Sequence, residues 1–257
     1  MEVASLSAQL AVQDAMAARG YPAPAVLTKL SPLGPCWVVA MAYKADGVPT
    51  DVRTVGVRRN MAWGLARFIA VAADCRDMPN LPRRQLPIGP SIWSTPHNVL
   101  LDFDATRRGA EWIDEIAREA LVTMRNAKSR IVVGHHDWSA KNMRMGPDGI
   151  AVLCDWDAVF VDREAFVLGS AAAHFPVTWE LPVPETPSVD EVRAFVRDYE
   201  QACGSDLTGL ELAETAAGAT YARAYKARCE HALAPSAVHW HGSSRKSLKN
   251  HGPFSFS

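Results

Sequence analysis

Two short apolar runs, each followed at once by a cluster of polar side chains, constrain the fold of this 257-residue chain more than any other feature. The first run, residues 130–133, precedes the segment GHHDWSAKN, and the second, residues 150–154, precedes the segment DWD. Short apolar runs bounded by polar loops and turn residues are typical of strands. We therefore expect a small sheet whose strand ends carry the chemistry of the protein.

The polar clusters hold three carboxylates and one amide, which are Asp137, Asn142, Asp155 and Asp157. A carboxylate beside buried strands is costly without a cation or hydrogen-bond donors, and oxygen ligands favour a hard divalent cation. Mg2+ takes a few protein oxygens and completes its shell with water and substrate phosphate, which leaves one carboxylate free to accept a proton. The residues thus predict a magnesium site with a general base beside it.

The order of these groups is that of a protein-kinase-like site, in which a histidine, a base, a metal-binding amide and a metal-binding acid follow one another. The residues in that order are His135, Asp137, Asn142 and Asp155. The segments HHDWSAKN and LCDWD resemble the H-G-D-x-x-x-x-N and I-D-W-D/E motifs of the aminoglycoside phosphotransferase and choline kinase family. The resemblance also covers ARGYPAP, VVAMAYKADG and TYARAYKARCEHAL, and thereby most of residues 1–234.

The resemblance implies an α+β, protein-kinase-like two-lobe fold and an ATP- and Mg2+-dependent kinase. Such an enzyme moves the γ-phosphoryl group of ATP to a hydroxyl of a small polar molecule, here an aminoglycoside or another amino-alcohol-like acceptor. Carried over by position, the family roles make Asp137 the catalytic base and make Asn142 and Asp155 the Mg2+ ligands. Asp157 becomes a supporting or second-metal carboxylate, and His135 braces the backbone of the catalytic loop.

The family's hinge, which meets adenine, corresponds to Met41, Ala42 and Tyr43. The resemblance implies that Met41 packs on the base and that backbone groups of this segment pair with it. Met41 and Tyr43 are therefore candidates for nucleotide binding. Core packing explains both side chains equally well.

The resemblance divides the chain into three parts. Residues 1–45 form a partial N-lobe and hinge, in which a helix precedes two apolar runs, 25–30 and 36–43, that predict a β-hairpin. Residues 46–234 form a mainly helical C-lobe with the catalytic loop and the metal motif, and residues 235–257, rich in Ser, Gly and His, predict a disordered tail. Family members carry a phosphate-covering loop and a strand Lys ahead of the first helix, so the expected N-lobe is truncated to the helix and the hairpin.

Two other functions stay open at this point. Without the strand Lys, the chain would be a catalytically impaired kinase-like remnant that binds a metabolite or partner. Alternatively, His135 and His136 could hold a metal with Asp137 and Asp155 in a hydrolase, although neighbouring side chains on a strand point to opposite faces. His136 also stands where the family has a glycine.

Composition excludes several classes of function. Lys+Arg 27 against Asp+Glu 28 give a net charge of -1, which argues against a dedicated nucleic-acid binder. Five widely spaced cysteines indicate neither a zinc ribbon nor a disulfide framework, and no run of about 18 apolar residues predicts a membrane span. We expect a cytoplasmic protein whose partner is a small hydroxyl acceptor.

An acceptor with ammonium groups would need acidic partners on the C-lobe. The sequence offers many acids without a distinctive arrangement, namely Asp102, Asp104, Glu111, Asp114, Glu115, Glu185, Asp190 and Glu191. The identity of the acceptor therefore does not follow from the sequence.

Overall fold

The structure is a computed structural model that describes residues 2–89, 91–96, 98–236 and 242–256. It has an α+β fold with a small β part and a large helical part. Its elements in chain order are α1 (Val3–Ala18), β1 (Ser31–Leu33), β2 (Cys36–Val38), α2 (Val55–Val71), η1 (Ala73–Cys75), α3 (Glu111–Arg125), β3 (Ile131–His135), η2 (Ala140–Asn142), β4 (Met143–Gly146), β5 (Gly149–Leu153), η3 (Trp156–Ala158), β6 (Val159–Arg163), α4 (Glu164–His174), α5 (Val189–Cys203), α6 (Gly209–Leu233) and α7 (Ser244–His251).

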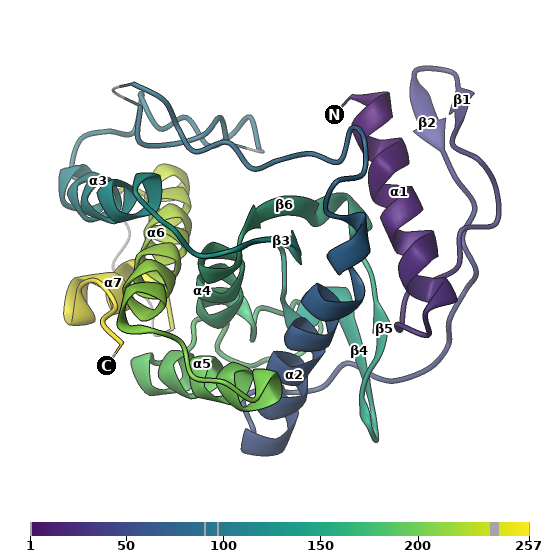
Figure 1. Cartoon of the computed structure of the whole chain (residues 1–257). Coiled ribbons are helices and arrows are strands. Elements are labelled where there is room, and N and C mark those ends of the chain that lie inside the picture. Colours follow the sequence, from purple (N-terminus) through teal and green to yellow (C-terminus); the bar gives the residue numbers. More distant parts are fainter. Residues whose placement is uncertain (1, 90, 97, 237–241, 257) are drawn as a thin grey trace.

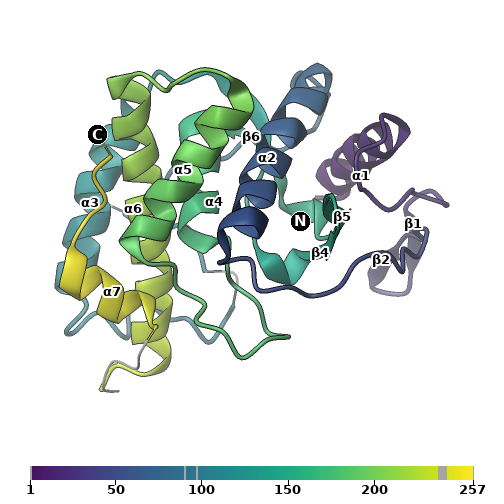
Figure 2. The ribbon, with the colours of Figure 1, turned by 90° about the horizontal axis from the view of Figure 1, so that it is seen from below.

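Helix α1 and the β1–β2 hairpin lie together on one side of the molecule, and helices α3, α6 and α7 lie on the other (Figure 1). The view from below shows the same separation, with α2, α4 and α5 between the two sides (Figure 2). Helix α1 packs on the core through Val12 and Met16, which are fully buried. The helix predicted at the start of the chain is therefore present, and it packs on the core on the same side of the molecule as the hairpin.

The predicted β-hairpin forms, but its first strand lies at Ser31–Leu33 and not within residues 25–30. Strands β1 and β2 pair antiparallel with Leu33 opposite Cys36, so the turn lies at Gly34 and Pro35. Gly34 has a φ of 58°, a conformation that glycine adopts at little cost. An isolated bridge between Val26 and Met41 extends the pairing toward α1.

Both apolar runs that follow α3 form strands, but they do not pair with each other. Strand β3 pairs antiparallel with β6, with Val133 opposite Val161. Strand β5 pairs instead with β4, with Met143 opposite Leu153. The catalytic-loop segment therefore leaves one ladder and enters another, and the metal motif returns from the second ladder to the first.

The helical part is built around α4, which is buried along nearly its whole length. Two glycines let α4 and α6 approach closely. A Cβ on Gly169 would lie 2.4 Å from the backbone oxygen of Thr215, and a Cβ on Gly218 would lie 3.1 Å from the Cα of Phe166. Any side chain at Gly169 would push the two helices apart, because the obstructing atom belongs to the backbone of α6.

The prediction of a disordered tail over residues 235–257 was wrong for the described part of that segment. Ser244–His251 form α7, in which Ser243 accepts a hydrogen bond from the backbone of Lys246 as the N-cap. Leu248 is 1% exposed and packs among residues of α3 and α6, and Phe254 is also buried. Residues 237–241 and 257 of the predicted tail lie outside the described residues.

In the described ranges, no helix is both long enough and apolar enough to cross a membrane.

Candidate functional site

The end of β3 and the residue before the metal motif are tied together by His135. The ring of His135 is 1% exposed, and burial lowers its pKa, so the neutral ring donates its Nε2 proton to the carbonyl oxygen of Cys154 at 3.1 Å. The backbone N–H of His136 also donates to Ala158, at 2.8 Å. These bonds hold the start of the catalytic loop against the turn that carries Asp155.

The amide of Asn142 connects the two predicted motifs. Its Nδ2 donates to the backbone oxygen of Asp137 at 2.9 Å and to Oδ2 of Asp155 at 3.3 Å. Asp155 has a φ of 64°, which places its backbone in the left-handed region at the turn between β5 and η3. Such strain in a residue other than glycine is typical of functional sites.

The electrostatics of this corner fit a divalent cation. Burial, together with a hydrogen bond and like charge from Asp157 and the charge of Asp137, raises the pKa of Asp155 to about 6. Carboxylates that crowd in this way repel one another until a cation neutralises them. Because both hydrogen bonds of Asn142 use Nδ2, its Oδ1 and the carboxylate of Asp155 are the oxygens that would hold the ion.

The histidines do not form a metal centre with the acids. Among the described residues, no group of three or more His, Cys, Asp or Glu side chains is placed to hold a metal ion. His136 instead accepts a hydrogen bond from Arg84 at 3.0 Å through Nδ1 and faces Asp162 with Nε2. Its pKa lies well below the ordinary value because of burial and the charge of Arg84. This arrangement argues against the hydrolase alternative.

Asp137 lies at the exit of β3 with its carboxylate held by its own loop. Its Oδ2 is 2.6 Å from Nζ of Lys141, and its Oδ1 accepts a hydrogen bond from Ser139 at 3.0 Å. Burial alone would raise the pKa of Asp137, but the hydrogen bond and charge of Lys141, with the bonds from Asn142 and Ser139, lower it. Asp137 is therefore an ionised hydrogen-bond acceptor at neutral pH.

Asp137 and Lys141 open onto a cavity of about 630 Å³ between β6, α4, α6 and the loop from α4 to α5. Aromatic side chains form much of its wall, and these are Phe160, Trp179, Tyr221 and Tyr225. A cavity of this size and lining is typical of a site for a small molecule. Asp137 thus faces the space in which an acceptor would bind.

The charges of the cavity come in pairs. Lys226 on α6 lies 2.9 Å from Glu185, and Lys141 pairs with Asp137. Glu185 is the only one of the eight predicted acceptor-binding acids that lines the described part of this cavity. His174 on α4 also lines it, and burial with the charge of Lys226 lowers its pKa to about 3.

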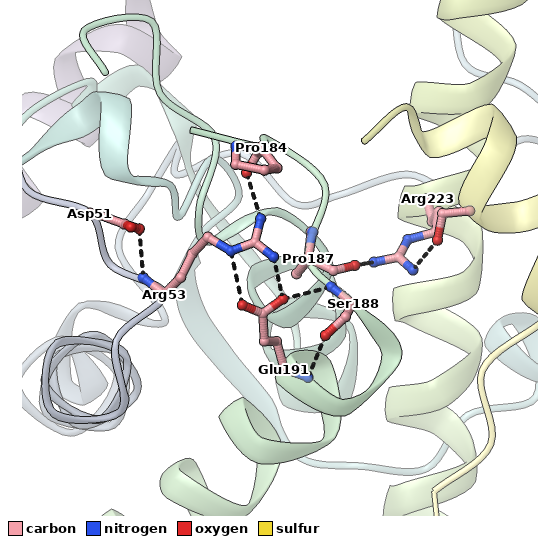
Figure 3. A network of polar contacts seen from close by, with 8 residues as sticks. Asp51, Arg53, Pro184, Pro187, Ser188, Glu191 and Arg223 are labelled. Atoms are coloured by element: carbon pink, nitrogen blue, oxygen red, sulfur yellow. Dashed lines mark hydrogen bonds and ion pairs between the residues drawn. The ribbon is translucent and has the colours of Figure 1, made fainter. Parts of the chain in front are cut away.

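Two arginines hold the far end of the loop over residues 176–187, which carries Trp179 and Glu185. Arg53 donates to the carbonyl oxygen of Pro184 at 2.9 Å and pairs through Nη2 with Glu191 at 2.7 Å (Figure 3). Arg223, itself buried, donates to the carbonyl oxygen of Pro187 at 2.8 Å. The wall of the cavity is therefore fixed from both the N-terminus of α2 and the middle of α6.

Helix α1 connects the predicted hinge with the metal motif. Gln9 donates from Nε2 to the backbone oxygens of Asp157 at 2.6 Å and Val159 at 3.0 Å. One helical turn later, Gln13 donates to the backbone oxygen of Pro24 at 2.6 Å and lies 3.4 Å from Sδ of Met41. The hinge segment and the metal motif thus lie along the same face of α1.

The two predicted nucleotide-binding residues differ in their surroundings. Residues on either side of the Val26–Met41 bridge bond to each other, with Leu27 N–H donating to Ala40 and Ala42 N–H donating to Ala25, both at 2.8 Å. In such a pairing, the N–H and C=O of Met41 point away from the partner strand and can meet a ligand. Tyr43 is 91% exposed, and no hydrogen bond within the described residues joins it to the acidic residues.

Sequence reasoning assigned no role to several residues around this site. Lys141 stands inside the catalytic motif, so its place in the loop was visible although its contact with Asp137 was not. Trp179, Lys226 and Gln9 come from other elements, and no spacing in the sequence marks them as neighbours of the motif.

Comparisons with known proteins found similarity in structure only. No protein family matches the sequence, and no curated protein matches it. Among solved structures, an amicoumacin kinase in complex with AMP-PNP and Ca2+ has a TM-score of 0.67 at 10% identity, over 99% of this chain and 80% of that one. A Plasmodium vivax ethanolamine kinase has a TM-score of 0.55 at 13% sequence identity, over 97% of this chain and 73% of that one.

An aminoglycoside phosphotransferase from Alicyclobacillus acidocaldarius gives a TM-score of 0.58 at 13% identity, over 98% of this chain and 79% of that one. The chain therefore has the protein-kinase-like fold of aminoglycoside phosphotransferases and choline/ethanolamine kinases, as the sequence motifs predicted.

Proposed function

We propose that the chain transfers the γ-phosphoryl group of ATP to a hydroxyl of a small polar molecule. The observation that carries this proposal is the Asn142 amide, which joins Asp137, on the wall of the cavity, to Asp155, where a cation would bind. A base on the acceptor side and a metal ligand on the nucleotide side are the two parts that in-line transfer requires. The fold shared with small-molecule kinases supports the same reaction.

In the proposed reaction, Asp137 orients the acceptor hydroxyl and receives its proton. The hydroxyl oxygen forms a bond to the γ-phosphorus, the bond from that phosphorus to the β–γ bridging oxygen breaks, and ADP leaves with the electron pair. Mg2+ held by Asn142 and Asp155 would neutralise and orient the phosphates. His135 holds the loop of Asp137 against the turn of Asp155, and Met41 offers its backbone groups to the adenine ring of ATP.

The cavity favours an amino alcohol with a single ammonium group over a polycationic aminoglycoside. Glu185 can accept a hydrogen bond from one ammonium beside that from Lys226, and aromatic side chains line the same cavity. A polycation would also meet Lys141 and Lys226, whose charges lie in the same cavity. The fold is shared by an ethanolamine kinase and by an aminoglycoside phosphotransferase, so this preference rests on the cavity alone.

Thermal unfolding with and without Mg2+ and AMP-PNP tests the nucleotide site first. A ligand at about 100 times its Kd stabilises the folded state by about 2.7 kcal/mol, so the midpoint should rise in the wild type. Asp155→Ala should remove the shift, whereas Asp148→Ala, in the exposed turn between β4 and β5, should keep it. If Mg2+ and AMP-PNP do not move the wild-type midpoint at millimolar concentration, the proposed function is wrong.

Transfer of labelled phosphate from ATP then tests the acceptor class, with ethanolamine, 1-amino-2-propanol and kanamycin as probes. We expect phosphorylation of an amino alcohol that is lost in Asp137→Asn. Nucleotide binding without transfer to any of the probes would favour the alternative of a kinase-like binding protein.

A further inference from the structure

Lys141 is held with its ammonium group at the centre of the candidate site. Its backbone N–H donates to the carbonyl oxygen of Val177 at 2.8 Å, and its Nζ lies 2.6 Å from Oδ2 of Asp137. The ring of Trp179 covers the ammonium, with its centroid 4.8 Å from Nζ. The side chain is 20% exposed, so the charge faces the cavity from a fixed position.

The proposed reaction places the γ-phosphoryl group beside this ammonium. The attacking hydroxyl must lie against Asp137, and the phosphates must lie against Asn142 and Asp155. The γ-phosphorus therefore lies between these groups when the hydroxyl attacks in line. Nζ of Lys141 is 2.6 Å from Oδ2 of Asp137, so the ammonium lies at the acceptor end of this line.

The other cations that line the cavity contact groups other than Asp137 and Asp155. Lys226 pairs with Glu185 on the loop above α6, at 2.9 Å. Arg84 bonds to His136 at 3.0 Å and faces Asp162. Within the part of the cavity that the structure describes, Lys141 is the cation in direct contact with Asp137.

We propose that Nζ of Lys141 binds the γ-phosphoryl group of ATP and holds it during transfer to the hydroxyl that Asp137 orients. An ammonium has three donors, so one can stay on Asp137 while the others reach phosphate oxygens. The positive charge offsets the negative charge of the transferred group and keeps Asp137 from repelling it.

This inference rests on the proposed function. Measurements of nucleotide affinity can show whether the inference alone fails or the proposed function fails with it. The Kd values of AMP-PNP and ADP, each with Mg2+, are measured by calorimetry for the wild type and for Lys141→Met. The loss of a charged hydrogen bond to the γ-phosphoryl group should weaken AMP-PNP about tenfold or more and leave ADP nearly unchanged. Lys141→Arg should recover part of the loss, and Lys249→Met on the exposed face of α7 should show none.

A double-mutant cycle with Asp137→Asn distinguishes a direct contact from an indirect one. If Lys141 only neutralises Asp137, Lys141→Met will have no effect on AMP-PNP once Asp137 is Asn. If Lys141 contacts the phosphate, the tenfold loss will persist in that background. An unchanged ratio of AMP-PNP to ADP affinity in Lys141→Met overturns the inference, and a wild type that binds neither nucleotide overturns the proposed function with it.

Discussion

The carboxylate of Asp162 is predicted to destabilise the fold at neutral pH. Its side chain is 8% exposed, accepts a hydrogen bond from the backbone of Arg163 at 2.7 Å and lies 3.8 Å from Nη1 of Arg84. Burial raises the pKa of Asp162 to about 6, although the charge of Arg84 opposes the change. In an unfolded chain the same pKa is about 3.9.

The direction in which stability changes with pH follows from the number of protons that the folded and unfolded states bind. Between about pH 4 and pH 6 the folded protein keeps a proton that the unfolded chain has lost, so stability falls as the pH rises through this window. A difference of about two pKa units corresponds to roughly 3 kcal/mol, of which about 2 kcal/mol develops between about pH 4.5 and pH 7.5. Asp162→Asn cannot ionise and should lack this loss.

Urea unfolding of the wild type and Asp162→Asn, followed by tryptophan fluorescence across this range, measures the difference. The free energy of unfolding of Asp162→Asn should gain about 2 kcal/mol on the wild type as the pH rises. Loss of the contact between Asp162 and His136 would instead shift the free energy of unfolding by the same amount at every pH in this range. Asp148→Asn in an exposed turn is the control, and a difference between Asp162→Asn and the wild type that stays constant with pH would refute the reasoning.

Three further changes test the packing. Leu248→Ala should cost about 2 to 5 kcal/mol in urea unfolding, because the side chain is 1% exposed; a cost near zero would mean that α7 does not dock. Gly169→Ala should lower the thermal midpoint strongly because its Cβ would meet the backbone of α6, whereas Gly209→Ala has open space and should not. Arg58→Met removes the 2.8 Å partner of the buried Asp198 and leaves Arg59 at 3.7 Å, so it should cost less than the roughly 3 to 5 kcal/mol of a fully unpaired buried charge, and adding Asp198→Asn should recover much of the loss.

The sequence predicted the helices and the strands more reliably than their pairing. The predicted runs 130–133 and 150–154 largely coincide with β3 (Ile131–His135) and β5 (Gly149–Leu153), because their apolar side chains suit a buried ladder. Strand β6 could not be foreseen in the same way, because it includes the charged Asp162 and Arg163 and follows a polar turn. Five residues with charges at one end do not show the alternation that identifies a strand.

The C-terminal segment 235–257 shows that amino-acid composition can wrongly predict disorder when a segment is ordered by contacts with distant parts of the chain. Its Ser, Gly and His residues indicate disorder, yet Leu248 packs on an apolar surface formed by α3 and α6, and Phe254 is buried as well. Arg58 stands next to Arg59 in the sequence, a basic pair that indicates a solvated helix face, yet Arg58 forms a buried ion pair with Asp198, 140 residues later. The sequence around these residues does not indicate either contact, because the partners lie far away in the chain.

In the candidate site, the residues that share a motif were predicted and those that do not were missed. Asp137 and Asn142 are five residues apart, so one loop fixes their relation. Trp179 and Tyr225 reach the cavity from a loop and from α6, which come together only when the helices pack. Sequence spacing therefore indicates the chemistry of the site better than the shape of its acceptor pocket.

The two glutamines of α1 have a mechanical consequence. Gln9 bonds to the metal motif and Gln13 to the segment before the hinge, so α1 cannot turn about its axis without breaking buried hydrogen bonds at both places. Each such bond contributes about 1 kcal/mol and costs more when its buried partner is left unpaired. We therefore expect α1 to keep its orientation relative to the segment 155–159 when nucleotide is added, which would confine any movement in the proposed reaction to loops.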